Sequence, residues 1–327
     1  MKPLRFGFTS FVTTGLLVCV FFQGLVCAQE AYPNRVIKMV VPFPPGQLSD
    51  AMARVIAERL KDAMGQPVIV ENRPGQAGSI GVASFAKAPP DGYTLLLGAT
   101  AAFASNKFLY ANVPYDPLKD FQPITMLSTT PLVLMVGAHV PARSLAELIK
   151  IMRDQPERLT YGSSGFGTIS HTMMEAFKLA VGGGARHIPF QGNAASTMAL
   201  RSGQIDIQFD GVITAQQQIQ AGTFIPLAVP MLKRNPALPN IPTLAESGFS
   251  GFERTAWGAM FAPANTPKTI VDKLNREISK ITSSADFRKK YEMLDLVHTT
   301  PEEAQKWIAN DYNYWREVIQ KANIKAE

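Results

Sequence analysis

The stretch Val36–Asp50 constrains the fold of this chain most, because an apolar run gives way to a Pro- and Gly-containing loop and then to an amphipathic pattern. Residues 36–41 are rich in β-branched side chains, which is typical of a strand buried on both faces of a parallel sheet. The prolines of segment 42–45 lack a backbone N–H, so they end the strand and stiffen the loop. We expect Ser49 or Asp50 to cap the helix that follows.

A strand, loop and helix of this kind aim backbone N–H groups into the crevice at the carboxyl end of the strand. Open α/β sheets bind ligands in that crevice, and N–H groups at a helix N-terminus prefer an anion. An ordinary βα connection has the same pattern, so this stretch alone does not separate a binding loop from a simple turn.

The first 28 residues have the pattern of a secretory signal peptide. Lys2 and Arg5 precede an apolar run that ends in Val26–Ala28, so we expect cleavage before Gln29. A membrane anchor is the alternative, but the apolar core is short and contains the polar or small residues 13–15. Both cysteines lie in this leader, so the exported chain is expected to have no disulfide, cysteine nucleophile or thiolate metal site.

Length and charge limit the functions available to the remaining 299 residues. A chain of this length favours two lobes over one. Its formal net charge of +6 includes two basic leader residues, and the mild positive balance that remains favours small anionic ligands by steering. No cluster of Lys and Arg stands out, so nucleic acid is not an expected partner.

Strands alternate with helical stretches along most of the chain, which predicts parallel sheets. The alternation restarts after an apolar strand at Pro131–Val136. A strand at Thr255–Pro263 is expected to return the chain to the first lobe. A long helix at Ile270–Ile281 and two further helices, at Pro301–Ala309 and Asp311–Ala322, are expected to complete it.

Segment 165–170 matches the dinucleotide-binding fingerprint except at its last glycine, where Ser170 stands, and no acidic residue follows at the expected distance. Anion capture is the better interpretation, because Ser163, Ser164 and Thr168 offer hydroxyls beside free N–H groups at a helix start. Plain N-capping by Thr168 is the alternative. The four histidines show no metal-ligand spacing, and neither a nucleophile elbow nor a P-loop is present. We therefore expect no catalytic residue, no metal and no cofactor.

Several loops instead offer amide and hydroxyl groups at positions where strands are expected to end. Two lobes with such loops make a cleft for a polar ligand. Asn193 is also expected to cap a helix. The candidate ligand-binding residues are Gln47, Thr100, Ser163, Ser164, Gly165, Thr168, Gln191, Asn193, Asp210 and Gly211.

From about Tyr32 onward the chain resembles the substrate-binding receptors of the tripartite tricarboxylate transporter family, the Bug receptors. The resemblance rests on several motifs in combination. They are Val41-Pro-Phe-Pro-Pro-Gly46, Glu71-Asn-Arg-Pro-Gly75, Lys87-Ala-Pro-Pro-Asp-Gly-Tyr-Thr-Leu-Leu96, Pro114-Tyr-Asp-Pro117, Asp120-Phe121, Phe209-Asp210 and Phe261-Ala-Pro-Ala264.

This resemblance implies an α/β, two-lobed periplasmic-binding-protein fold of type II, in which helices flank two mixed sheets and two strands form the hinge. Residues 29–130 and 255–327 are expected to form lobe 1, and residues 131–254 lobe 2. It also implies a carboxylate held in the interlobe cleft, with Phe43 on one wall.

Three positions depart from the pattern of the family. Gln47 stands where a second glycine is usual, Gln191 where a lysine or similar residue is usual, and Gly211 where asparagine is usual. Gln47 is expected to make the pocket smaller or more polar, and Gly211 removes a side chain from the facing lobe. The ligand class therefore carries over from the resemblance, but the particular acid does not.

The expected function is that of a monomeric periplasmic receptor. It would capture a small carboxylate, either an organic or an amino acid, for the membrane permease subunits of a tripartite tricarboxylate transporter. A periplasmic co-receptor that presents a carboxylate to a sensor kinase is the alternative. An enzyme is disfavoured, because neither a nucleophile nor a cofactor motif was found.

Overall fold

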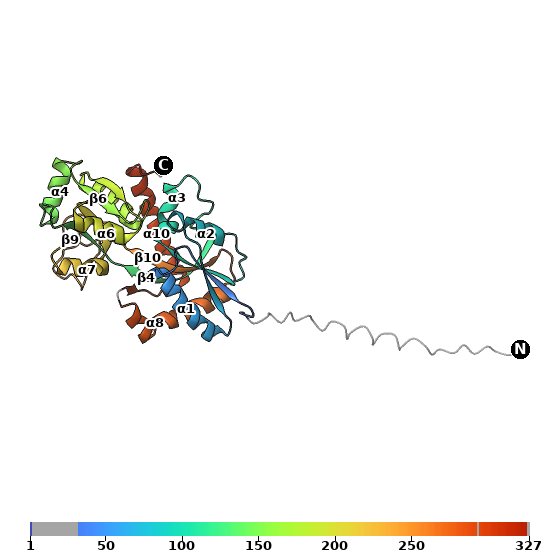
Figure 1. Ribbon diagram of the computed structural model, residues 1–327. Coiled ribbons are helices and arrows are strands. Elements are labelled where there is room, and N and C mark those ends of the chain that lie inside the picture. Colours follow the sequence, from blue (N-terminus) through green and yellow to red (C-terminus); the bar gives the residue numbers. More distant parts are fainter. Residues whose placement is uncertain (2–31, 293, 326–327) are drawn as a thin grey trace.

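The computed structural model describes residue 1, residues 32–292 and residues 294–325. The expected signal peptide lies outside these ranges apart from its first residue. Within the described ranges, no helix is long and apolar enough to cross a membrane. Figure 1 shows two α/β lobes, one coloured green to yellow and one largely blue and orange, with helix α10 between them.

The first sheet has the strand order β11-β4-β10-β3-β1-β2. Three of its strands run parallel to one another, namely β1 (Ile37–Val41), β2 (Val68–Asn72) and β3 (Thr94–Ala99). The other three pair antiparallel, namely β4 (Phe121–Thr130), β10 (Ala256–Pro263) and the short β11 (Asp295–Leu296).

Side chains of β1 reach both faces of this sheet, because successive residues of a strand alternate. Ile37, Met39 and Val41 pack against α1 (Leu48–Met64), α8 (Lys268–Ser283) and α9 (Ala285–Lys290), whereas Val40 packs in the cluster on the opposite face. The opposite face is covered by α2 (Ser79–Phe85), η2 (Ala101–Ser105) and the first half of α10 (Pro301–Lys321). The prediction of a strand buried on both faces is confirmed.

The second sheet has the strand order β7-β6-β8-β5-β9. Its parallel strands are β6 (Thr160–Ser163), β7 (Arg186–Pro189) and β8 (Ile207–Gly211), and the antiparallel ones are β5 (Leu132–Gly137) and β9 (Phe224–Ala228). The helices of this lobe are α4 (Leu145–Asp154), α5 (Ile169–Val181), α6 (Asn193–Ser202) and α7 (Val212–Gln220).

Two neighbouring strands of the first sheet lead to the second. β4 ends at Thr130 and only Pro131 separates it from β5, while β10 begins at Ala256, directly opposite Thr130. Two mixed sheets flanked by helices, joined through two paired strands, are the predicted fold class, which is confirmed. The division into lobes at residues 130 and 255 stays a prediction.

Two sequence expectations about helix ends are wrong. Helix α1 begins at Leu48 after the N-cap residue Gln47, because the Asp50 carboxylate bonds back to the N–H of Gly46 from inside the first turn. The two expected C-terminal helices are one helix, α10. Asp311 does not start a new helix, since its side chain is buried and accepts a hydrogen bond from Trp257.

Candidate functional site

The parallel strands of the second lobe carry most of the candidate ligand-binding residues at one edge. Strands β6, β7 and β8 are parallel, so their carboxyl ends lie together, and each leads into a helix. The N-cap residues of these helices are Thr168, Gly192 and Gly211, and none of them caps its helix with a side chain. No side chain therefore caps the first turns of these three helices. The N–H of Val212, at the start of α7, donates to the carbonyl of Pro131 at 2.9 Å, and the other first-turn N–H groups suit an anion.

Asn193 is not the cap of α6, as the sequence predicted, but its first residue. The cap is Gly192, whose φ of 98° lies in the left-handed region that glycine tolerates. The Asn193 side chain is directed to β8 instead, where its amide donates to Asp210 at 2.9 Å.

Hydroxyl groups line the loop between β6 and α5. Thr168 is the N-cap residue of α5, but its Oγ1 donates to the carbonyl of Gly165 at 2.7 Å and lies 3.1 Å from Ser170 Oγ, so the alternative of side-chain capping by Thr168 is wrong. Ser170 Oγ also accepts the N–H of Ser164 at 3.1 Å. The loop is thus held by its own hydroxyls, and Ser164, Gly165 and Thr168 stay only partly buried.

Ser163 has a different environment from its neighbours. Its side chain is fully buried, its Oγ lies 2.7 Å from His187 Nε2, and it also bonds within the loop to the backbone of Gly165. A serine and a histidine at this distance have the spacing of a nucleophile and its base. The buried hydroxyl is not presented to a substrate, however, so the pair acts as a support for the loop.

Asp210 joins strand β8 to the first turns of helix α6. Its two carboxylate oxygens accept from Asn193, Thr197, Gln208 and the N–H of Gly211 at 2.7–3.2 Å. Burial raises the pKa of this carboxyl, and the hydrogen bond from the N–H of Gly211 acts in the opposite direction. A β-carbon at Gly211 would lie 3.3 Å from Thr214 Oγ1 and 3.5 Å from the Thr130 side chain, so this position has little spare space.

In the first lobe, hydrogen bonds to Asn72 and Asp50 hold the loop that carries Phe43 and Gln47. The amide of Asn72 donates to the carbonyl of Phe43 at 3.1 Å and to the Asp50 carboxylate at 2.9 Å. The hydrogen bond from Arg54 lowers the pKa of Asp50 to about 2, helped by the N–H of Gly46. Phe43 is half-buried and Gln47 is exposed at the start of α1.

Thr100 bonds to the backbone of the neighbouring strand. Its hydroxyl accepts the N–H of Trp257 at 2.8 Å and is buried, so it connects the end of β3 to β10.

Asn106, the first residue of helix α3 (Asn106–Leu109), supports a strained turn. Its buried amide donates to the carbonyls of Gln76 and Ala77 at 3.0 and 3.3 Å. These two residues have φ of 45° and 47°, a strained conformation for residues with side chains.

The two lobes touch at the loop of Gly167. Ser105 Oγ donates to the carbonyl of Gly167 at 3.5 Å, and the rings of Tyr110 and Phe166 meet edge to face, with centroids 6.4 Å apart. A β-carbon at Gly167 would lie 2.9 Å from the Leu109 side chain. The loop after β6 therefore packs against the loop after β3.

The structure thus brings the second-lobe candidates together and leaves the others apart. Asn193, Asp210 and Gly211 form one hydrogen-bonded group, and the loop of Ser163–Thr168 adjoins it, since the N–H of Gly192 donates to Ser164 at 3.2 Å. Gln191 is exposed. Within the described part of the chain, no hydrogen bond, ion pair or ring contact joins Phe43 or Gln47 to the second lobe, so the shared interlobe site stays a prediction.

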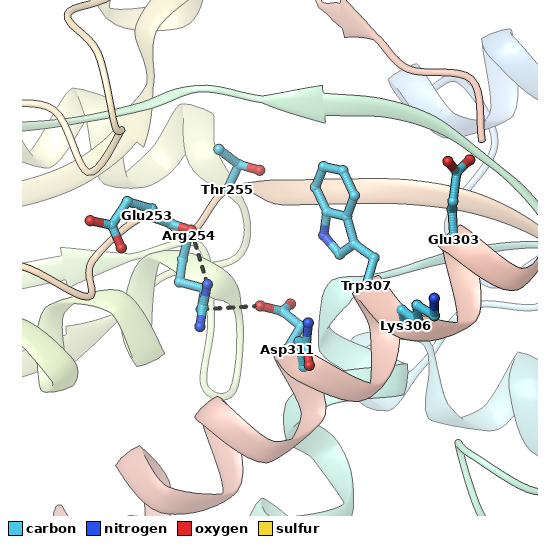
Figure 2. Close-up of a pocket in the computed structure, with 8 residues that line it drawn as sticks. Glu253, Arg254, Thr255, Glu303, Lys306, Trp307 and Asp311 are labelled. Carbon is cyan, nitrogen blue, oxygen red and sulfur yellow. Dashed lines mark hydrogen bonds and ion pairs between the residues drawn. The ribbon is translucent and has the colours of Figure 1, made fainter. Parts of the chain in front are cut away.

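A cavity of about 370 Å³ lies elsewhere, between the segment before β10 and helix α10. Figure 2 shows Arg254 directed toward Asp311, with which it forms an ion pair at 3.5 Å, and Trp307, which extends from the same helix as Asp311. None of its lining residues is a predicted ligand-binding residue, and it adjoins α10 rather than the edges where parallel strands end. We therefore do not assign the ligand to it.

Sequence reasoning missed four supporting residues. Ser170 was considered only as a replacement for glycine, and His171 and His187 only as metal ligands. Asn106 had no motif that singled it out.

Among the described residues, no group of three or more His, Asp or Glu is placed to hold a metal.

A two-lobed fold with loops of both lobes meeting near uncapped helix N-termini defines the class of periplasmic solute-binding proteins. Residues 52–324 match the family described as the tripartite tricarboxylate transporter family receptor, TctC. The chain belongs to this family. Its members are solute-binding receptors and not enzymes, which confirms that expectation.

Three solved structures are similar over nearly the whole described chain. Periplasmic binding protein BugD is 33% identical, with a TM-score of 0.75, and the match covers 90% of this chain and 100% of that one. Rpa4515 of R. palustris with adipate is 33% identical, with a TM-score of 0.78 and the same coverage. MatC of Rhodopseudomonas palustris with bound malate is 28% identical, with a TM-score of 0.76, and covers 88% of this chain and 100% of that one. The resemblance to the Bug receptors is confirmed.

Proposed function

We propose that this protein captures a small carboxylate in the periplasm, in a cleft between its lobes, and delivers it to the permease subunits of a tripartite tricarboxylate transporter. The single observation that carries the proposal is the edge of the second sheet. There, three parallel strands lead into three helices without side-chain caps, which leaves N–H donors for an anionic group.

Hydroxyl and amide groups at the same edge are further hydrogen-bond donors for a carboxylate. Ser164, Thr168 and Asn193 are only partly buried or exposed, so their polar atoms are available to a ligand in addition to the bonds they make. The adipate and malate of the two similar structures belong to the same chemical class. Phe43, Thr100, Gln47 and Gln191 remain proposed members of the site.

Calorimetry with adipate and malate, each compared with its dimethyl ester, tests the proposal. A charge-assisted hydrogen bond contributes about 1.5–3 kcal/mol, so loss of the charge should weaken binding by about 10-fold or more. Equal affinity for an acid and its ester would show that the site does not recognise carboxylate. A wider panel of organic and amino acids in a thermal-shift screen then identifies the preferred ligand.

Delivery to a permease is tested separately. Cells that lack the gene for this receptor should lose uptake of the ligand found in the screen, and expression of the receptor should restore it. Restoration of a ligand-dependent transcriptional response with no change in uptake would contradict delivery to a transporter.

A further inference from the structure

Stacked rings lie beneath the loop of residues 163–168 in the second lobe. Tyr161 and His187 stand side by side on the parallel strands β6 and β7, with their rings stacked at 4.7 Å between centroids. His171, from the first turns of α5, stacks on His187 at 4.0 Å with an interplanar angle of 11°. The ring of Phe166, in the loop itself, lies 4.8 Å from His171.

Both imidazoles hold the loop through ring nitrogens. The N–H of Gly167 donates to His171 Nδ1 at 3.1 Å, and His187 Nε2 lies 2.7 Å from Ser163 Oγ. Gly167 has a φ of 75° and is buried against the first lobe, so its N–H has no access to solvent as an alternative partner. Losing the His171 acceptor would leave this buried donor unpaired.

The surroundings favour neutral rings. Burial lowers the pKa of His171 to about 4 and that of His187 to about 3. The charge of Lys178 also lowers the pKa of both histidines, whereas the charge of Glu175 raises the pKa of His187. Lys178 and Glu175 form an ion pair at 2.8 Å, and Glu175 also accepts a hydrogen bond from the hydroxyl of Tyr161. The exposed Arg186 precedes His187 on β7. The stacked rings of Tyr161, His187 and His171 are therefore uncharged at neutral pH.

We propose that His171 is a positioning residue for ligand binding, because its Nδ1 must remain an acceptor to hold Gly167 and thereby keep the loop 163–168 in its ligand-binding conformation. This inference rests on the proposed function of that loop. An accepting Nδ1 places the single ring proton on Nε2. A second proton can then bind only at Nδ1, where it would face the N–H of Gly167 and release the loop.

Two variants separate this role from simple packing. His171→Asn keeps an acceptor at the δ position and loses the ring, whereas His171→Phe keeps a stacking ring and loses the acceptor. In calorimetry with adipate at pH 7, we expect His171→Phe to weaken binding at least 10-fold and His171→Asn to stay within about 3-fold of the wild type, since one unpaired buried donor costs about 1–3 kcal/mol. The opposite order would overturn the proposal in favour of packing.

Nuclear magnetic resonance of the ligand-free wild type gives a second measurement that needs neither variant nor ligand. We expect His171 to carry its proton on Nε2 at pH 7, and the amide signal of Gly167 to shift as His171 takes up its second proton. A proton on Nδ1 at pH 7, or an amide of Gly167 that does not respond, would overturn the proposal. If no acid of the panel binds the wild type, the proposed function fails, and the resonance measurement still decides the role of His171.

Discussion

At the scale of single residues, the site depends on polar side chains that are already paired inside their own lobe. Asp210 is the clearest example, because its oxygens accept hydrogen bonds from helix α6 and from its own strand β8, and its exposed fraction is 2%. A carboxylate in this position repels an anionic ligand unless the ligand offers a donor. Its hydrogen bonds within the lobe already give Asp210 a structural role, and the proposed contact with the ligand comes in addition to that role.

Replacing Asp210 tests that structural role. Asp210→Ala should lower the free energy of unfolding by about 2–4 kcal/mol, because the Gly211 N–H and the other donors lose their acceptor in a buried site. Asp210→Asn should cost about 1 kcal/mol or less, since the Gln208 amide, which now donates to Asp210, can turn over and present Oε1 as an acceptor to the new amide. Urea denaturation of both variants makes the comparison, and equal losses would contradict this account.

Acid should destabilise the fold through His171. Burial is the main cause that lowers its pKa from 6.5 to about 4. Between pH 6.5 and pH 4, His171 is therefore protonated in the unfolded chain but neutral in the folded chain. The stability from the neutral ring is present above pH 6.5 and is lost as the pH falls to about 4, by about 2–3 kcal/mol. Unfolding free energies at pH 7 and pH 4.5 should therefore differ less in His171→Asn than in the wild type. An unchanged difference would contradict the assignment.

At the scale of elements, helix α10 joins the two lobes. Ala304 and Ile308, in its first half, pack in a first-lobe cluster, whereas Trp315, Val318 and Ile319 pack in the main second-lobe cluster. Figure 1 shows this red helix running between the lobes. Helix α10 therefore contributes to the cores of both lobes.

The buried bond between Trp257 and Asp311 should stabilise this arrangement. Trp257 Nε1 donates to Asp311 Oδ2 at 2.8 Å, where the other oxygen pairs with Arg254. Trp257→Phe should lower the free energy of unfolding by about 2–3 kcal/mol, because the buried carboxylate loses a donor and the smaller ring leaves space. Trp307→Phe is the matched control, since Trp307 lies on α10, the helix of Asp311, and is 36% exposed, and thermal denaturation should find the change nearly neutral. Equal effects would refute the role of the bond.

At the scale of the whole molecule, the proposed shared site requires the ligand to favour the closed arrangement. A ligand shifts a conformational equilibrium only by its difference in affinity for the two states. We expect small-angle scattering to show a smaller radius of gyration with saturating adipate than without it. Ser202→Ala, which removes a hydroxyl at the far end of α6, should leave this change intact, whereas Thr168→Ala should reduce adipate affinity by about 10-fold. No compaction and no loss in Thr168→Ala would place the ligand elsewhere.

Local sequence patterns were enough to predict the order and kind of most elements. Apolar periodicity and the positions of proline and glycine act over a few residues, so the strand at 37–41 and its loop could be predicted from them. The alternation of strands and helices alone predicted parallel sheets, whereas the two mixed sheets were expected only from the family resemblance. The second-lobe candidates also adjoin one another as expected, because parallel strands end at a common edge.

The polar groups that support those loops could not be predicted from local patterns. His171 stacks on His187, Asp311 accepts from Trp257 and Asn106 holds Gln76, and each pair is separated by a stretch of chain that no local pattern spans. Such pairs depend on strand order and on the path of α10, which set the distance between residues remote in sequence. For the same reason Asp311, a helix-start signal by composition, became a buried hydrogen-bond acceptor in the middle of one continuous helix.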